Sequence, residues 1–263
     1  MRRVLHISDP HFGRSSPHLL EPLISLAAAC RPDLTVVSGD LTQRARNRQF
    51  REAAAFLKRL PAPVLTVPGN HDVPLDNLFL RVFAPWHRYR RHISPDLEPV
   101  FEDSELIVAG VNTVNPWVWQ QGRLSDTGVA RLERLFAKAG RRTCIAVMHH
   151  PLETLPAWQK TPIRIGRSGL ERLSAAGTDL VLCGHIHLAH VAPITAGPGI
   201  LTILAGTGLS DRLRGVENTV HLLEIDEGRV AVETFAADER QVFHRISRRF
   251  FRIGDKGWSA QPD

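Results

Sequence analysis

Five short polar motifs in this 263-residue chain combine the side chains that bind divalent metal ions. The motifs are Asp9-Pro10-His11, Gly39-Asp40, Gly69-Asn70-His71-Asp72, His149-His150 and Gly184-His185-Ile186-His187. Carboxylates, imidazoles and a carboxamide, with no thiolate among them, suit ions such as Mn, Fe, Zn or Co. Each motif alone is a weak signal, although GNHD and GHxH are moderately specific. All five in one chain predict a metal site.

Each motif directly follows a short apolar run with the length of a buried β-strand, at residues 4–8, 34–38, 64–67, 144–148 and 180–183. Amphipathic segments at 18–30, 47–60 and 125–139 predict helices between these strands. Strands that alternate with helices predict a parallel sheet, and the carboxyl ends of parallel strands converge on one crevice. Later segments, at 200–205, 220–225, 230–235 and 242–246, are typical of antiparallel strands.

Composition narrows the class of protein. Hydrophobic residues make up 43% and charged residues 23% of the chain, which is ordinary for a globular protein, and no apolar run is long enough to span a membrane. The net charge of +6 favours anionic partners such as phosphates or nucleic acid, although a solvated basic surface is the commoner explanation of such a charge. Three scattered cysteines and the lack of a signal peptide predict a reducing, cytoplasmic location.

The motif set from Asp9 to His187 resembles the calcineurin-like metallophosphoesterase superfamily. The opening at residues 6–11 and the run at 37–41 are most similar to its bacterial branch of class III cyclic-nucleotide phosphodiesterases and glycerophosphodiesterases. The resemblance implies an α/β fold, namely a four-layer α-β-β-α sandwich of two mixed β-sheets with flanking helices. It also implies a centre of two divalent metal ions.

Carried over by position, the resemblance implies two ligand sets that share a bridging Asp40. The first ion would take Asp9, His11, Asp40 and His187, and the second would take Asp40, Asn70, His149 and His185. His150 remains the alternative to His149. The serine/threonine phosphatases of the superfamily have the pattern GNHE, where this chain has GNHD. Purple acid phosphatases place a tyrosine where Gln43 stands here, so the chain is less similar to both branches.

The resemblance suggests hydrolysis of a small phosphodiester, such as a cyclic nucleotide or a glycerophosphodiester, by in-line attack of a metal-bridging hydroxide. Asn70 and His71 would bind the phosphoryl group. His71 would act as the general acid for the leaving group, and Asp72 would hold the His71 ring in the correct tautomer. The alternatives are a DNA or RNA nuclease, a phosphomonoesterase on the same core and, more remotely, a non-catalytic scaffold.

We expect a single domain over residues 1–253, with a helical, cap-like insertion at about 74–99 and a loose tail at 254–263. The arginines and aromatics of the insertion, among them Arg88 and Tyr89, would either hold a phosphate and stack on a base or pack as an ordinary amphipathic helix. Trp117, Trp119 and Trp158 would either line the pocket or form a homodimer contact.

Overall fold

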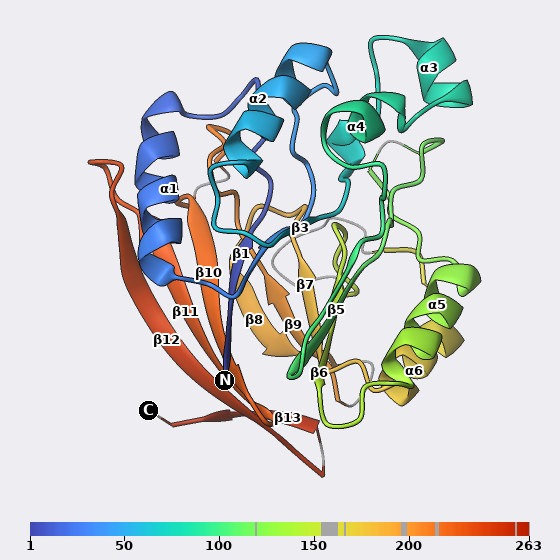
Figure 1. The fold of residues 1–263 in the computed structure, drawn as a ribbon, viewed down its shortest axis with the longest axis vertical. Helices are drawn as coiled ribbons and strands as arrows, with labels where there is room; N and C mark the ends of the chain where they lie inside the picture. Colours follow the sequence, from blue (N-terminus) through green and yellow to red (C-terminus); the bar gives the residue numbers. More distant parts are fainter. Residues whose placement is uncertain are drawn as a thin grey trace.

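The computed structural model describes residues 1–118, 120–153, 163–165, 167–195, 199–213, 216–255 and 257–262. Trp119 and Trp158 lie outside these residues, whereas Trp117 is exposed to solvent. The described strands form two mixed β-sheets that pack face to face, with helices on both outer sides (Figure 1). The predicted four-layer α/β arrangement is therefore confirmed.

The first sheet has the order β13-β12-β11-β10-β1-β2-β3. Its strands are β1 (Arg2–Ile7), β2 (Leu34–Val37), β3 (Val64–Thr66), β10 (Thr219–Asp226), β11 (Arg229–Ala237), β12 (Phe243–Gly254) and β13 (Gly257–Gln261). Strands β1, β2 and β3 pair in parallel, and the remaining pairs are antiparallel. The sheet thus joins a parallel part that precedes three of the polar motifs to an antiparallel part that follows them all.

The second sheet has the order β4-β5-β6-β7-β9-β8. Its strands are β4 (Val100–Glu102), β5 (Leu106–Gly110), β6 (Thr143–Val147), β7 (Leu180–Cys183), β8 (His190–Pro193) and β9 (Leu201–Leu204). Strand β9 was expected to be antiparallel, but it pairs in parallel with β7 and in antiparallel with β8. The short β8 reverses the chain and so lets β9 extend the parallel part of the sheet.

Three hydrophobic clusters fill the three interfaces between the four layers, because side chains alternate between the faces of a strand. Val4 and Ile145 lie in the cluster between the two sheets. Leu5 lies in a second cluster with the buried residues of α1 (Pro17–Cys30) and α2 (Asn47–Leu57). Ala146 lies in a third, with α5 (Asp126–Phe136) and α6 (Arg167–Ala175). The helices thereby cover the outer faces of the sheets (Figure 1).

The segment at 74–99 contains two short helices, α3 (Leu78–Phe83) and α4 (His87–His92). Tyr89 of α4 is fully buried and its ring contacts Phe50 edge-on, while Arg88 pairs with Asp76. Tyr89 thus packs in the core, as the amphipathic-helix alternative predicts. The rest of that alternative is wrong, because the Arg88 side chain is largely buried in its ion pair, while Phe79 and Phe83 of α3 are exposed. Whether the segment caps a crevice stays a prediction.

The predicted loose tail at 254–263 is wrong over most of its length. Residues Gly257–Gln261 form β13, which pairs in antiparallel with the free edge of β12. Trp258 of this strand is 6% exposed and lies in the cluster between the two sheets. Edge pairing and burial of one large aromatic ring order a segment whose local composition is typical of a loop.

The helices of the described chain are all too short or too polar to cross a lipid bilayer.

Candidate metal centre

The five polar motifs meet at the carboxyl ends of β1, β2, β3, β6 and β7, on the edge where the two sheets face each other. Backbone hydrogen bonds tie the motif segments together: the Asp9 amide donates to the Gly39 carbonyl (3.1 Å) and the Gly184 amide to the His149 carbonyl (3.0 Å). The His185 amide also donates to Oδ2 of Asp9 (3.0 Å), which links the two sheets. The convergence expected of parallel strands thus brings all seven predicted ligands together.

A first group of ligand atoms comes from Asp9, His11 and His187, all of them buried. Oδ1 of Asp9 lies 3.2 Å from Nε2 of His187 and 3.5 Å from Nε2 of His11, and the two histidine nitrogens are 3.0 Å apart. Three potential ligand atoms therefore point at one small volume.

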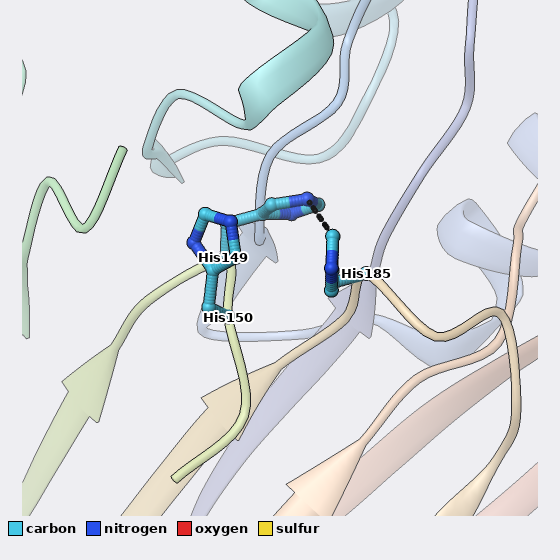
Figure 2. Close-up of side chains that lie close together, drawn as sticks. All are labelled: His149, His150 and His185. Carbon is cyan, nitrogen blue, oxygen red and sulfur yellow. Dashed lines mark hydrogen bonds between the residues drawn. The ribbon is translucent and has the colours of Figure 1, made fainter. Parts of the chain in front are cut away.

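A second group comes from Asn70, His149 and His185. Nε2 of His149 lies 3.2 Å from Oδ1 of Asn70 and 3.3 Å from Nδ1 of His185, the contact drawn in Figure 2. Oδ2 of Asp40 is 3.4 Å from Nε2 of His149 and 3.6 Å from Nε2 of His11. Asp40 therefore lies between the two groups, where a carboxylate shared by both would have to lie.

The second histidine of the pair is also close to this group. His150 and its neighbours His149 and His185 can present three ligand atoms within 4.8 Å of one another (Figure 2). Nδ1 of His150 contacts Oγ1 of Thr113 (2.8 Å), and burial, together with the charge of His149, lowers the pKa of His150 to about 3. His150 is thus neutral and buried, and it remains the alternative ligand.

The donor set fits divalent cations. Oδ1 of Asp9 is buried and makes no hydrogen bond with the described residues, and its neighbours are the imidazole nitrogens of His187 (3.2 Å) and His11 (3.5 Å). A buried carboxylate oxygen without a hydrogen bond is costly. Burial acts to lower the pKa of His149, but the Asp40 carboxylate outweighs it and raises that pKa to about 9. Without cations, a proton on an imidazole therefore balances the buried carboxylates. Binding of cations would release that proton.

The backbone at this edge is strained. Five of the seven predicted ligands have positive φ angles: Asp9 (53°), His11 (47°), Asp40 (50°), His185 (73°) and His187 (60°). This left-handed region costs an L-residue about 1–2 kcal/mol. Gly184 is required for a different reason, because a Cβ there would lie 2.3 Å from Oδ2 of Asp9. Sharp turns thus aim the side chains inward, and strain of this kind is typical of functional sites.

His71 stands beside the two groups and is only partly buried. Its backbone amide donates to Oδ1 of Asp40 (2.8 Å), and its ring lies 5.0 Å from the ring of His11. Nδ1 of the ring donates to the backbone carbonyl of Gln43 (2.9 Å). Nε2, the other ring nitrogen, lies 3.4 Å from Nη1 of Arg212.

The role expected of Asp72 is wrong in its geometry. Its carboxylate accepts hydrogen bonds from the amides of Leu41 (3.1 Å), Thr42 (2.8 Å) and Gly69 (2.9 Å), and from the Thr42 hydroxyl. The Asp72 side chain turns toward these backbone amides, away from the His71 ring, because buried amides need hydrogen-bond acceptors. Burial and the nearby Asp40 raise the pKa of Asp72 to about 7. The Gln43 carbonyl, not Asp72, holds the His71 ring.

Two residues next to the site were not identified from the sequence. Gln43 was considered only as a departure from a tyrosine pattern, and Arg212 lies in a segment without any motif. Gln43 acts through its backbone carbonyl, which every residue has, so the residue type at position 43 does not reveal this role. Arg212 is one of many arginines, and only the folded chain distinguishes it from the others.

A family model described as calcineurin-like phosphoesterase matches residues 2–189, which include all five motifs. The chain belongs to the calcineurin-like phosphoesterase family. The family resemblance expected from the motifs is therefore confirmed.

Similar curated proteins include the glycerophosphodiester phosphodiesterase GpdQ of Enterobacter lignolyticus, which is 32% identical over 206 residues, 69% of each chain. The 3′,5′-cyclic adenosine monophosphate phosphodiesterase CpdA of Escherichia coli is 30% identical over 200 residues, covering 70% of this chain and 69% of that protein. Among solved structures, purple acid phosphatase PPD1 of yellow lupin matches with a TM-score of 0.65 at 15% identity, over 93% of this chain and 53% of that one. The likeness to the lupin enzyme concerns the fold alone.

Proposed function

We propose that this phosphoesterase is a dinuclear, metal-dependent phosphodiesterase that hydrolyses a small diester such as a cyclic nucleotide or a glycerophosphodiester. The observation that carries the proposal is the pair of buried ligand groups with Asp40 between them. Two curated relatives at about 30% identity, which are named phosphodiesterases for these two kinds of substrate, support the choice of diester.

We assign the seven predicted ligands to two cations according to the two groups that they form. Asp9, His11, Asp40 and His187 would hold the first, and Asp40, Asn70, His149 and His185 the second. Divalent cations held there, Mn, Fe, Zn or Co by their donor set, would neutralise the anionic substrate and lower the pKa of water toward neutrality.

The chain's own polar groups would handle the substrate. The Asn70 amide has its oxygen turned toward His149 (3.2 Å), so its Nδ2 is the end that can donate to a phosphoryl oxygen. Because Nδ1 of His71 donates to the Gln43 carbonyl, the proton for the leaving group has to come from Nε2 of the same ring. The hydrogen bond to Gln43 thereby orients the acid.

A cytoplasmic location is part of the proposal. All three cysteines are buried and unpaired, as expected for a reducing compartment.

The test is a metal-reconstitution assay on a small panel of substrates. The purified chain, loaded separately with Mn, Fe, Zn or Co, is offered bis-p-nitrophenyl phosphate, p-nitrophenyl phosphate, cyclic AMP, glycerophosphocholine and single-stranded DNA. Elemental analysis runs alongside. We expect two ions per chain and faster turnover of the small diesters than of the monoester.

The variant Asp40→Asn sharpens this assay. Because Asp40 would serve both ions, its replacement should remove most of the bound metal and, with it, most of the activity. The matched control is Asp126→Asn, on a 93% exposed side chain that belongs to none of the motifs, which should keep both. Full metal content in Asp40→Asn contradicts the ligand assignment, and preferred cleavage of DNA would favour the nuclease alternative.

A further inference from the structure

Arg212 connects two parts of the candidate centre. It lies between β9 and β10, where its amide donates to Oγ of Ser210 (3.1 Å) and its carbonyl accepts from Nδ1 of His187 (3.2 Å). Because Nδ1 of His187 is engaged by this carbonyl, the other ring nitrogen, Nε2, points toward Asp9. These two hydrogen bonds hold the backbone of Arg212 beside His187, a predicted ligand. The position of its Cα, and so the reach of its side chain, is therefore fixed.

The guanidinium of Arg212 lies beside the predicted acid. Nη1 is 3.3 Å from Oε1 of Gln43 and 3.4 Å from Nε2 of His71. Both distances are long for hydrogen bonds, so the contacts orient the group without holding it tightly. Within the described part of the chain, its Nε and Nη2 make no hydrogen bond, so these donors are free to bind another group.

The positive charge of Arg212 has no acidic partner in the regions that the structure describes. Other arginines differ, since Arg14 pairs with Asp211 (2.9 Å) and Arg88 pairs with Asp76 (2.8 Å). The side chain is also half-buried, which reduces the screening of its charge by water. An oriented guanidinium without a counter-ion is suited to an anion that can accept two parallel hydrogen bonds, as a phosphoryl group can.

We propose that Arg212 binds the phosphoryl group of the diester substrate and of the phosphomonoester product. The inference rests on the proposed function and names a residue of the same site. A phosphoryl oxygen between Nε2 of His71 and Nη1 of Arg212 would accept from both and would replace their weak mutual contact. Since the phosphomonoester product carries more negative charge than a diester, Arg212 should bind it more tightly than the substrate and cause product inhibition. Inorganic phosphate carries the same kind of charge and serves as a probe.

The test measures binding of inorganic phosphate to the Mn-loaded protein by isothermal titration calorimetry. A charged hydrogen bond of this kind corresponds to about a tenfold to hundredfold change in affinity, so Arg212→Met should raise the Kd for phosphate by that factor. Arg212→Lys keeps the positive charge but loses the planar, two-pronged donor geometry of the guanidinium. Its Kd for phosphate should therefore lie between those of Arg212→Met and the wild type. Arg141→Met, on an 88% exposed side chain, is the matched control and should bind as the wild type does.

Metal content and turnover separate this inference from the proposed function. The carbonyl that contacts His187 belongs to the backbone, so Arg212→Met should still bind two ions per chain. Equal Kd values for phosphate in the wild type and Arg212→Met overturn the inference, as does a wild-type protein that binds metal but no phosphate. Failure of the metal-loaded wild type to hydrolyse any ester in the panel instead overturns the proposed function, whatever Arg212→Met shows.

Discussion

The polar edge of the molecule and its carboxyl-terminal hairpins use unusual backbone conformations in opposite ways. At the polar edge, positive φ angles fall on residues with metal-binding side chains, such as Asp40 and His187. In the hairpin between β10 and β11, they fall on the turn residues Glu227 and Gly228, whose side-chain chemistry plays no part in the site. Strain at the edge positions side chains, whereas at the turn it only reverses the chain.

Charge follows the same division. On the β10–β12 part of the first sheet, arginines face carboxylates across strands, as in the pairs Arg245–Glu233 and Arg248–Glu224, both at 2.7 Å. At the polar edge, the buried Asp9 and Asp40 have no arginine or lysine partner among the described residues and contact imidazoles. The hairpins thus balance their own charges, while the edge leaves carboxylates for cations to neutralise.

Among variants of the polar edge that should keep their metals, we expect His71→Ala to cause the largest loss of turnover. Turnover of a diester with a poor leaving group should fall about 100- to 10,000-fold, because the leaving oxygen loses its proton donor. Metal content should stay at the wild-type level, since His71 is not a predicted ligand. Steady-state kinetics and elemental analysis measure the two quantities.

The control for this variant is His18→Ala, which removes an exposed histidine of α1. It should leave turnover unchanged. Hydrolysis of the same diester by His71→Ala at near the wild-type rate would show that His71 is not the acid.

A variant in the hairpin region should affect stability and not chemistry. Trp258→Ala empties a buried position between the sheets and should lower the free energy of unfolding by about 3–5 kcal/mol. Turnover per folded molecule should stay within twofold of the wild type under conditions where the variant is folded. Urea unfolding followed by circular dichroism gives the first quantity, and kinetics give the second. A loss of bound metal in this variant would mean that the two regions are coupled.

The smallest effect tests the strain directly, in the metal-free protein. At His187, with its φ of 60°, the glycine variant should be more stable than the alanine variant by about 1 kcal/mol. At Arg252, in the middle of the β12–β13 pairing, the order should reverse, with alanine better by about 0.5–1 kcal/mol. Urea unfolding of the four variants provides the comparison, and the same order at both positions would remove the strain argument.

Much of the fold was predictable because apolar runs and amphipathic segments repeat with the periods of strands and helices. The runs ending before Asp9, Asp40 and His185 mark β1, β2 and β7 closely. The tail was not predictable in this way. Strand β13 depends on the free edge of β12 and on the burial of Trp258, and neither is visible in the ten residues themselves.

The sequence by itself determined the order of polar motifs after apolar runs, and with it the family, the layered architecture and the set of side chains available for metal. Only the tertiary structure decided which neighbours those side chains meet. Asp72 turns into its loop, the Gln43 carbonyl holds His71, and Arg212 arrives from a distant loop. The physical reason is that periodicity encodes the direction of strands, whereas hydrogen-bond partners depend on turns and on chain segments far apart in sequence.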